Sequence, residues 1–248
     1  MYLAACAAMF AVAYLASILT ITVGYHRGLA HRAMALHPAL RRVVINGGIW
    51  LTGLDPKAWI VMHRMHHAYS DTARDPHAPA GGLLKMVVQQ YYGTSNTIRG
   101  LRYNDPAYTT FADDLDFDLH PLTKRWMWWF PYVMHAIAGV IIGVTVGWLF
   151  GAAYFTGIAS HPFQGALVNY FGHSAGRRNF DTPDTSRNNV FVAWVTLGEG
   201  FQNNHHRYPG SVSFAYRRSE IDLGYFACLA LDAVGLVTIE REQLIPKR

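Results

Sequence analysis

Two long segments of the chain, Met1–Gly24 and Trp126–Gly176, contain no charged residue. As a helix with a rise of about 1.5 Å per residue, the first segment reaches roughly 36 Å, enough to cross a hydrocarbon core of about 30 Å. The second segment is too long for one span and is typical of a helical hairpin, with its turn expected within 147–157. A cleaved signal peptide is the alternative for the first segment. That alternative fits poorly, because no basic residue precedes the apolar run and Tyr-His-Arg follows it where small residues mark cleavage.

The positions of the charged residues indicate how these segments cross a membrane. All 21 Lys and Arg residues lie in 25–125 and 177–248, and the net charge is +5. A hairpin returns the chain to the side it left, so both basic blocks face one compartment, which the positive-inside rule assigns to the cytoplasm. The basic charge is thus explained by topology and indicates no nucleic-acid partner. An interfacial aromatic belt is expected at Trp126, Trp128, Trp129 and Tyr132.

These patterns predict an all-α integral membrane protein with one domain over 1–248. Few transmembrane helices, 1–24 and a hairpin within 126–176, are expected to carry a cytoplasmic helical cap formed by 25–125 and 177–248. A bacterial inner membrane, with the cap facing the cytoplasm, is the expected location.

The remaining composition and shorter segments refine this picture. The chain is 51% hydrophobic and 15% charged, which excludes a disordered protein. Cys6 and Cys228 are too few for a disulfide scaffold and are expected as buried thiols. Val43–Leu54 is predicted to be a membrane-surface or partly embedded helix, and Tyr225–Ile239 an interfacial or packed helix. Tyr92–Lys124 is expected to be loop-rich, with a solvated acidic patch. The patch consists of Asp113, Asp114, Asp116 and Asp118.

Histidines concentrate beside the predicted spans. Of the 13 in the chain, those in local patterns are His26, His31, His63, His66, His67, His173, His205 and His206. At about 100° per residue, the three from 63 to 67 share an arc of roughly 100°, so their rings can converge on one point. The first two diverge by about 140°, so they can bind one ion only if the helix end is irregular, or can reach neighbouring ions. Imidazole binds iron, copper, nickel and zinc, which leaves the metal open.

The other histidines are expected to have ordinary roles. His135 and His161 are predicted to be satisfied structural residues on apolar faces, and His37, His77 and His120 to lie on the surface or in loops. Any single pair of the patterned histidines can also be structural, without binding a metal. Four patterns on one membrane face favour metal ligation, since so many unpaired imidazoles would otherwise be costly to pack together.

At these histidines the chain resembles the membrane-bound fatty acid desaturases, most of all the stearoyl-CoA (delta-9 acyl) branch. The resemblance covers about 21–236. The matching motifs are His26-Arg…His31-Arg, His63…His67, Asp75-Pro76-His77, Val168-Asn169…His173 and Gly198-Glu199-Gly200-Phe201-Gln202-Asn203-Asn204-His205-His206. The family's activity is then implied: a di-iron centre that uses O2 as co-substrate and two electrons to remove hydrogens from an acyl chain.

The resemblance also implies the roles of individual residues. The eight patterned histidines are expected to bind the two irons, and Asn169 to hold a water at one of them. Gln202 stands where the family's third box normally starts with His, and its amide oxygen is a weaker and harder ligand. Glu199 and Asn203 are expected around the ligands, where they orient the imidazoles.

The resemblance also bears on the acyl substrate, the number of membrane spans and the source of electrons. Val61-Met62 replaces the Arg-Asp pair with which the animal enzymes help to hold CoA, so the acyl substrate can be linked to CoA, to an acyl carrier protein or to a lipid. The family has four spans and this sequence predicts three, which places the N-terminus outside. No cytochrome b5-like segment is fused, and a separate donor such as a ferredoxin or cytochrome b5-type protein is expected.

Other functions compete with desaturation. Hydroxylation, triple-bond formation and oxidative decarboxylation of an acyl chain are alternatives on the same scaffold. A haem-binding membrane electron carrier needs axial histidines that face each other within the spans, and only His135 is placed for that. A metal transporter or sensor would place polar ligands along the spans, which carry almost none.

Overall fold

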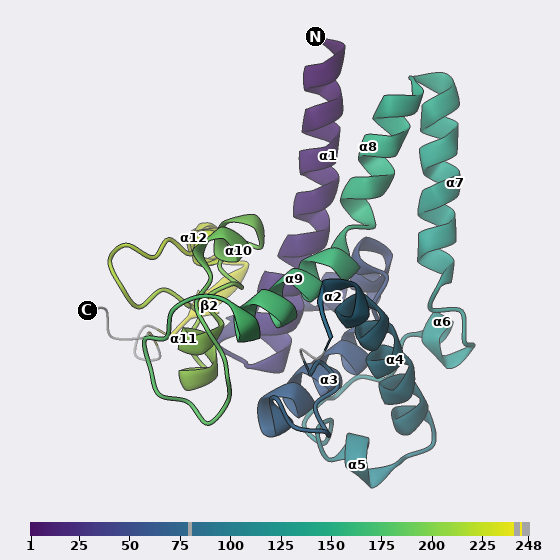
Figure 1. Cartoon of the computed structure of the whole chain (residues 1–248). Helices are drawn as coiled ribbons and strands as arrows, with labels where there is room; N and C mark the ends of the chain where they lie inside the picture. The colour runs from purple at the N-terminus through teal and green to yellow at the C-terminus, as the bar shows by residue number, and fades with distance from the viewer. Residues whose placement is uncertain (79–80, 241–243, 245–248) are drawn as a thin grey trace.

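The computed structural model describes residues 1–78, 81–240 and 244. Three helices, α1 (Tyr2–Leu19), α7 (Phe130–Thr145) and α8 (Trp148–Ile158), stand side by side, and the other elements gather at one end of them (Figure 1). These other elements are η1 (Thr20–Ala30), β1 (Met34–Leu36), α2 (Pro38–Thr52), α3 (Pro56–Tyr69), α4 (Leu83–Arg102), α5 (Pro106–Thr109), α6 (Pro121–Lys124), α9 (His161–Ser174), α10 (Val190–Val195), α11 (Gln202–Arg207), α12 (Leu223–Ala233) and β2 (Val237–Ile239).

The first predicted span forms one long apolar helix. The helix α1 continues into η1, so Tyr2–Ala30 is helical over 29 residues, and its most apolar 18-residue window has a mean hydropathy of 2.1. Only 28% of its most apolar window is buried, which leaves a large apolar surface without a protein partner. Within the described residues it is the one helix long and apolar enough to cross a membrane.

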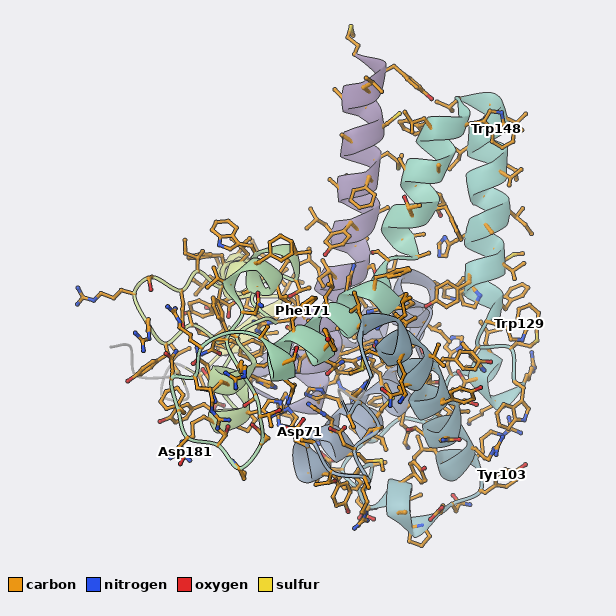
Figure 2. The ribbon with its side chains drawn as sticks, viewed as in Figure 1. Asp71, Tyr103, Trp129, Trp148, Phe171 and Asp181 are labelled. Atoms are coloured by element: carbon orange, nitrogen blue, oxygen red, sulfur yellow. The ribbon has the colours of Figure 1, made fainter. Side chains whose placement is uncertain are left out.

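The second charge-free segment forms a hairpin that is shorter than predicted. The helix α7 has 16 residues, and the return helix α8 has 11. The turn between them lies at Gly147, where φ of 140° favours glycine. After Ile158 the chain bends, and α9 runs across the foot of the three upright helices (Figure 1). Figure 2 places Trp129 and Trp148 near opposite ends of this hairpin.

Two segments differ from the sequence-based expectation. The prediction that Tyr92–Lys124 is loop-rich is wrong over its first part, because α4 continues to Arg102. Ile98 and Leu101 bury its inner face, and basic residues occupy its last turn. The helix predicted over Tyr225–Ile239 ends with α12, and β2 then pairs antiparallel with β1. This two-stranded ribbon corrects the all-α prediction for an otherwise mostly helical fold.

The helix α3 lies at the centre of the packing that positions the histidines. Proline at its first position and Asp55, which accepts from the backbone N–H of Ala58, set its start. One side of α3 packs Val61 against Ile98 and neighbouring core residues, and the other packs Ile60 against Tyr25 of η1. The orientation of α3 is therefore fixed from both sides.

The surface and the thiols largely follow the sequence. Both cysteines are free and buried, as predicted. The acidic patch is exposed at Asp116 but is paired rather than simply solvated: Asp114 binds Arg64 with both carboxylate oxygens, and Asp116 contacts Arg41. Such exposed pairs contribute little to stability.

Candidate metal centre

A π-helix brings the first two patterned histidines together. In η1 the backbone N–H of His31 donates to the carbonyl of His26, five residues earlier, at 3.1 Å. In that geometry residues five apart lie one turn above another, so the two rings share a face, with centroids 5.0 Å apart. The irregular helix end considered in the sequence is thus present.

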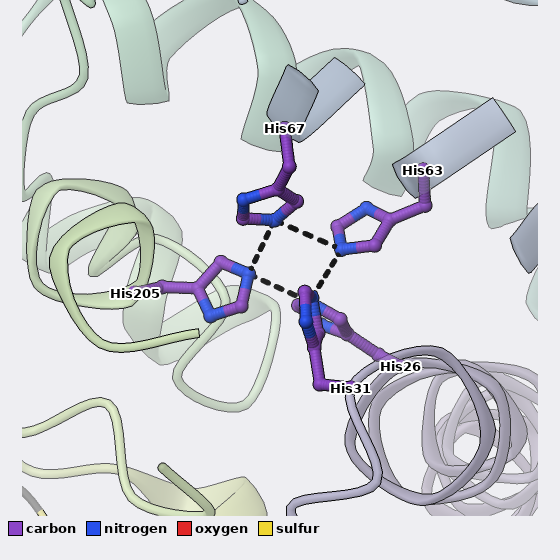
Figure 3. A group of neighbouring side chains, drawn as sticks. All are labelled: His26, His31, His63, His67 and His205. Atoms are coloured by element: carbon purple, nitrogen blue, oxygen red, sulfur yellow. Dashed lines mark hydrogen bonds between the residues drawn. The ribbon is translucent and has the colours of Figure 1, made fainter. Parts of the chain in front are cut away.

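Five imidazoles converge at one place, which we call the five-histidine group (Figure 3). Its members are His26, His31, His63, His67 and His205, and their ligand atoms lie within 4.8 Å of one another. The Nε2 atoms form a chain of contacts: 2.6 Å from His31 to His63, 3.1 Å from His63 to His67, 2.9 Å from His67 to His205, and 2.9 Å from His205 to His26. Five lone-pair-bearing rings around one point form a donor set for a cation.

Glu199 fixes the proton on the first of these rings. His26 donates from Nδ1 to Glu199 at 2.6 Å, which leaves Nε2 unprotonated and directed at the group. Glu199 also accepts from Arg27 at 2.8 Å and from the Thr22 hydroxyl. Arg27 is fully buried and binds Asp222 with its other nitrogen at 3.0 Å. This chain of charges ties η1 to the segments before α11 and α12.

A second set, the three-histidine group, consists of His66, His173 and His206. Each ring donates from Nδ1 to an aspartate: His66 to Asp75 at 3.0 Å, His173 to Asp71 at 3.2 Å, and His206 to Asp184 at 2.6 Å. All three Nε2 atoms are buried and have no hydrogen-bond partner among the described residues. A carboxylate behind the ring and an unpartnered nitrogen in front of it is the arrangement of metal-bound histidine.

Burial favours the neutral form of several of these imidazoles. Removal from water lowers the pKa of His63, His67 and His205 well below the usual 6.5, and the neighbouring imidazoles add to the effect. The pKa of His206 falls to about 4 by burial, although the hydrogen bond to Asp184 opposes that shift. Neutral imidazole is the form that binds a metal ion, so the groups are ready for one at neutral pH.

The prediction that His63, His66 and His67 converge on one point is wrong for His66. The helix α3 places His63 and His67 in the five-histidine group and directs His66 to the other group. The two groups are adjacent, since the rings of His67 and His206 lie 4.5 Å apart. The histidines therefore form two neighbouring groups instead of one, and α3 and α11 each contribute histidines to both groups.

The four predicted non-histidine residues occupy different places. Gln202 is buried, and its amide oxygen has no hydrogen-bond partner among the described residues. Asn169 donates to the carbonyl of Gly165 and lines a cavity of about 50 Å³ together with Gln202, Glu199 and His26. Both residues thus face the neighbourhood of the histidines.

The side chain of Asn203 bonds to a neighbouring loop and not directly to the histidines. It accepts from the backbone N–H of Asn179 at 2.7 Å and donates to the carbonyl of Phe180 at 3.0 Å. It thereby holds the loop that carries Asp184, the partner of His206. Its contribution to the site passes through that loop.

The remaining histidines divide into satisfied and unsatisfied ones. His37 and His120 cap α2 and α6 by accepting from backbone N–H groups. His135 uses both ring nitrogens, with the Tyr154 hydroxyl at 2.7 Å and the carbonyl of Trp50 at 2.5 Å, so neither is free to bind a haem. His161 is buried, and its Nδ1 has no partner in residues 1–78, 81–240 and 244, unlike the satisfied residue expected.

The expectation that His77 lies on the surface or in a loop is correct as to the loop, but the residue is buried. It lies in a turn but is 6% exposed, its ring centroid is 5.6 Å from that of His66, and its Nδ1 has no partner among the described residues. It is held there because Asp75 accepts from its backbone N–H at 2.8 Å.

Sequence reasoning missed the aspartates behind the three-histidine group and the aromatic support of the other. Trp59 stacks on His63 with centroids 4.9 Å and planes 10° apart. Of the aspartates, Asp75 was visible within its motif, since an acid shortly after a histidine-bearing helix can reach back to it. Asp71 and Asp184 had no such signal, because their partners are distant in the sequence.

Comparison with known proteins places these features in a family. Residues 2–218 match the family model described as fatty acid desaturase. A hex-5-enoyl-[acyl-carrier protein] acetylenase of Moorena producens (strain JHB) is 31% identical over 239 residues, covering 89% of this chain and 72% of that protein.

Two plant relatives have similar sequence identities to this chain, and their names give different molecules to which the acyl chain is attached. Delta-9 acyl-lipid desaturase 1 of Arabidopsis thaliana is 28% identical over 92% of this chain and 72% of its own length. An acyl-CoA C20 Delta5-desaturase of Anemone leveillei is 29% identical over 92% of this chain and 71% of its own length. The relatives thus act, by name, on protein-, lipid- and CoA-linked acyl chains.

Proposed function

The chain belongs to the fatty acid desaturase family, and on that premise we propose that it is an O2-dependent di-iron enzyme that introduces a double bond into an acyl chain. The observation that carries the proposal is the pair of adjacent histidine groups. In the three-histidine group, every ring has a carboxylate behind it and, within the part of the chain that the structure describes, a nitrogen without a partner in front. A core without a cation gains nothing from such an arrangement.

The two groups would each hold one iron. The five-histidine group offers five imidazoles, and the three-histidine group offers three together with the amide oxygen of Gln202 from the same helix as His206. Asn169, which lines the small cavity beside Gln202, would hold a water there. Imidazole and amide ligands without a thiolate suit iron in an oxygen-dependent site.

The reaction balances with the expected co-substrates. A –CH2–CH2– unit gives up two hydrogen atoms, which amount to two protons and two electrons, and a separate donor such as a ferredoxin or a cytochrome b5-type protein supplies two more electrons. Together with two protons these reduce one O2 to two waters, and the acyl chain is left with one C=C bond. When bound, the two irons supply the oxidising power for removing hydrogens from an unactivated chain.

The chain's own residues orient the ligands and exclude water. Asp71, Asp75 and Asp184 keep the protons of their imidazoles on Nδ1, and Glu199 does so for His26. Trp59 packs on His63 and Phe214 on His205, and these aromatic rings shield the two imidazoles from water.

A membrane location follows from the same proposal. The desaturase family is membrane-associated, and α1 with η1 exposes an apolar surface of membrane-spanning length. We place α1, α7 and α8 in the bilayer, with the histidine-bearing elements on the cytoplasmic side of a bacterial inner membrane, where all Lys and Arg residues lie.

Product analysis tests the reaction type. Purified iron-loaded protein, given reductant, O2 and a saturated acyl substrate, is expected to yield the olefin, detected by mass spectrometry. Exclusively hydroxylated product would contradict desaturation. Triple-bond formation is the second candidate, because an acetylenase is 31% identical to the chain. An olefinic substrate separates the two, since only an acetylenase converts it to an alkyne.

A further inference from the structure

An apolar cavity of about 370 Å³ lies beside the histidine groups. Three of its lining residues, Trp59, Gln90 and His161, also line the smaller cavity that reaches His26 and His63. Trp59 stacks directly on His63. A chain that occupies the larger cavity therefore has a direct route to the five-histidine group.

The outer end of this cavity reaches the surface through aromatic residues. Tyr91 of α4 and Trp129 line the cavity, yet they are 55% and 47% exposed, so the cavity opens where they lie. Trp128, which also lines the cavity, packs on Tyr91 with ring centroids 5.3 Å apart. Trp129 directly precedes α7, so the opening is at the foot of the apolar hairpin (Figure 2).

The first half of α4 presents an apolar stripe beside this opening. Its exposed members are Leu84, Val88, Tyr91 and Tyr92, with exposures between 52% and 79%. At about 100° per residue they fall within an arc of roughly 100°, so they form one continuous face. An apolar face of this kind, continuous with an aromatic belt, is typical of a helix that lies in the membrane interface.

The cavity also lacks the charges that a soluble carrier requires. Among the described residues that line it there is no Lys, Arg, Asp or Glu, and Met62 forms part of its wall. Basic residues such as Lys57, Arg102 and Lys124 line a separate pocket that shares no lining residue with it. The phosphate of a CoA or carrier-protein arm would thus lack cationic partners along this wall.

Building on the proposed desaturase function, we propose that the acyl chain enters this cavity sideways from the bilayer while it is esterified to a membrane glycerolipid. The opening between α4 and the start of α7 admits the chain, and the lipid headgroup stays at the interface. Lys85, the one charged residue in 83–92, is exposed on α4 and can reach a lipid phosphate by extending its side chain.

A comparison of carriers tests this route. The iron-loaded protein is placed in nanodiscs of phosphatidylethanolamine and phosphatidylglycerol, with a ferredoxin, its reductase and NADPH. One deuterated saturated acyl chain is offered as phosphatidylglycerol, as the CoA thioester or as the acyl-carrier-protein thioester. We expect conversion of the lipid-linked chain to exceed both thioesters by at least about tenfold.

The outcomes separate the two proposals. Equal or faster conversion of a thioester overturns the lateral route and leaves the desaturase function intact. If the iron centre is shown spectroscopically to be reduced and none of the three substrates is converted, the desaturase function itself is overturned.

Matched variants locate the opening. Tyr91→Asp places a carboxylate at the mouth and is expected to lower lipid conversion on the order of tenfold, since a charge at a membrane interface costs less than one at the bilayer centre. Tyr103→Asp makes the same change at an exposed tyrosine outside the cavity (Figure 2) and is expected to keep wild-type activity. Equal behaviour of the two variants contradicts the proposed opening.

A labelling experiment on the unmodified protein does not depend on how the variants fold. Phosphatidylglycerol with a photoreactive acyl chain is expected to label peptides from 83–94 and 126–132. Labelling confined to the surfaces of α1, α7 and α8 would overturn the proposal.

Discussion

The three-histidine group and the five-histidine group differ in what orients their rings. Asp75, Asp71 and Asp184 hold the three rings from behind, so their Nε2 atoms point inward without help from an ion. In the five-histidine group, His26 alone has such a carboxylate among the described residues, and the rings of the group contact one another through Nε2. His205 leaves its Nδ1 without a hydrogen-bond partner among the described residues.

This difference indicates two ways to build a metal site. In the three-histidine group the aspartates orient each of the few ligands, whereas the five-histidine group offers two more imidazoles. The three-histidine group should therefore be sensitive to any single change, whereas the five-histidine group should tolerate the loss of one ring.

The largest expected effect comes from removing one ring from each group. His66→Ala leaves two imidazoles and is expected to lower bound iron from two to about one per chain and to abolish turnover. His31→Ala leaves four imidazoles and is expected to retain most of its iron, with reduced activity. Metal analysis of the purified variants measures both, and equal iron loss in the two variants would contradict the contrast.

Removing a carboxylate behind a ring should have a smaller effect. Asp184→Asn keeps the size of the side chain but weakens its hold on His206, and we expect iron affinity at the three-histidine group to fall about 10- to 100-fold. Competition with an iron chelator measures this loss. Asp181→Asn, in the same loop but fully exposed, is the control and should leave affinity unchanged.

A substitution at Gln202 is expected to increase iron binding instead of reducing it. Gln202→His supplies an imidazole in place of a weaker amide oxygen and is expected to raise the iron occupancy of the three-histidine group. Gln202→Leu should lower it, because the amide oxygen is lost while the volume is kept. If all three proteins bind iron equally, Gln202 does not contribute a ligand.

Acid should destabilise the metal-free protein through the buried imidazoles. The pKa of His206 is about 4 in the folded protein and about 6.5 when unfolded, so the unfolded chain binds more protons between these values. Stability is therefore expected to fall as the pH drops from about 6.5 towards 4, and bound iron should reduce this dependence. Thermal unfolding with and without iron measures it, and a flat profile for the metal-free protein would contradict the neutral, buried state.

The sequence predicted which histidines lie close together, but it did not predict how they divide into two groups. Charge-free segments and the spacing of His63 and His67 depend only on local periodicity, which a sequence displays. The assignment of His66 to the other group depends on how α3 is packed between its neighbours, which is a tertiary effect. The π-helix of η1 is also hidden from the sequence, because a pattern of residues does not reveal whether a helix is wound with i→i+5 hydrogen bonds.

The aspartates behind the three-histidine group also show that the sequence does not reveal contacts between distant segments. Asp75 lies nine residues after His66 and belongs to a recognisable motif, but Asp71 reaches His173 across 102 positions. Such pairs form only once α9 has crossed the foot of the upright helices, so no local signal announces them. The cavity beside Trp59 is likewise a product of packing between distant elements.

The most direct test of the central claim is a metal count combined with an aerobic assay on the same preparation. Two irons per chain, together with an olefinic product whose yield follows iron content, is the result expected from two adjacent histidine groups. Protein that oxidises an acyl chain at full rate with one iron per chain, or with none, would contradict it.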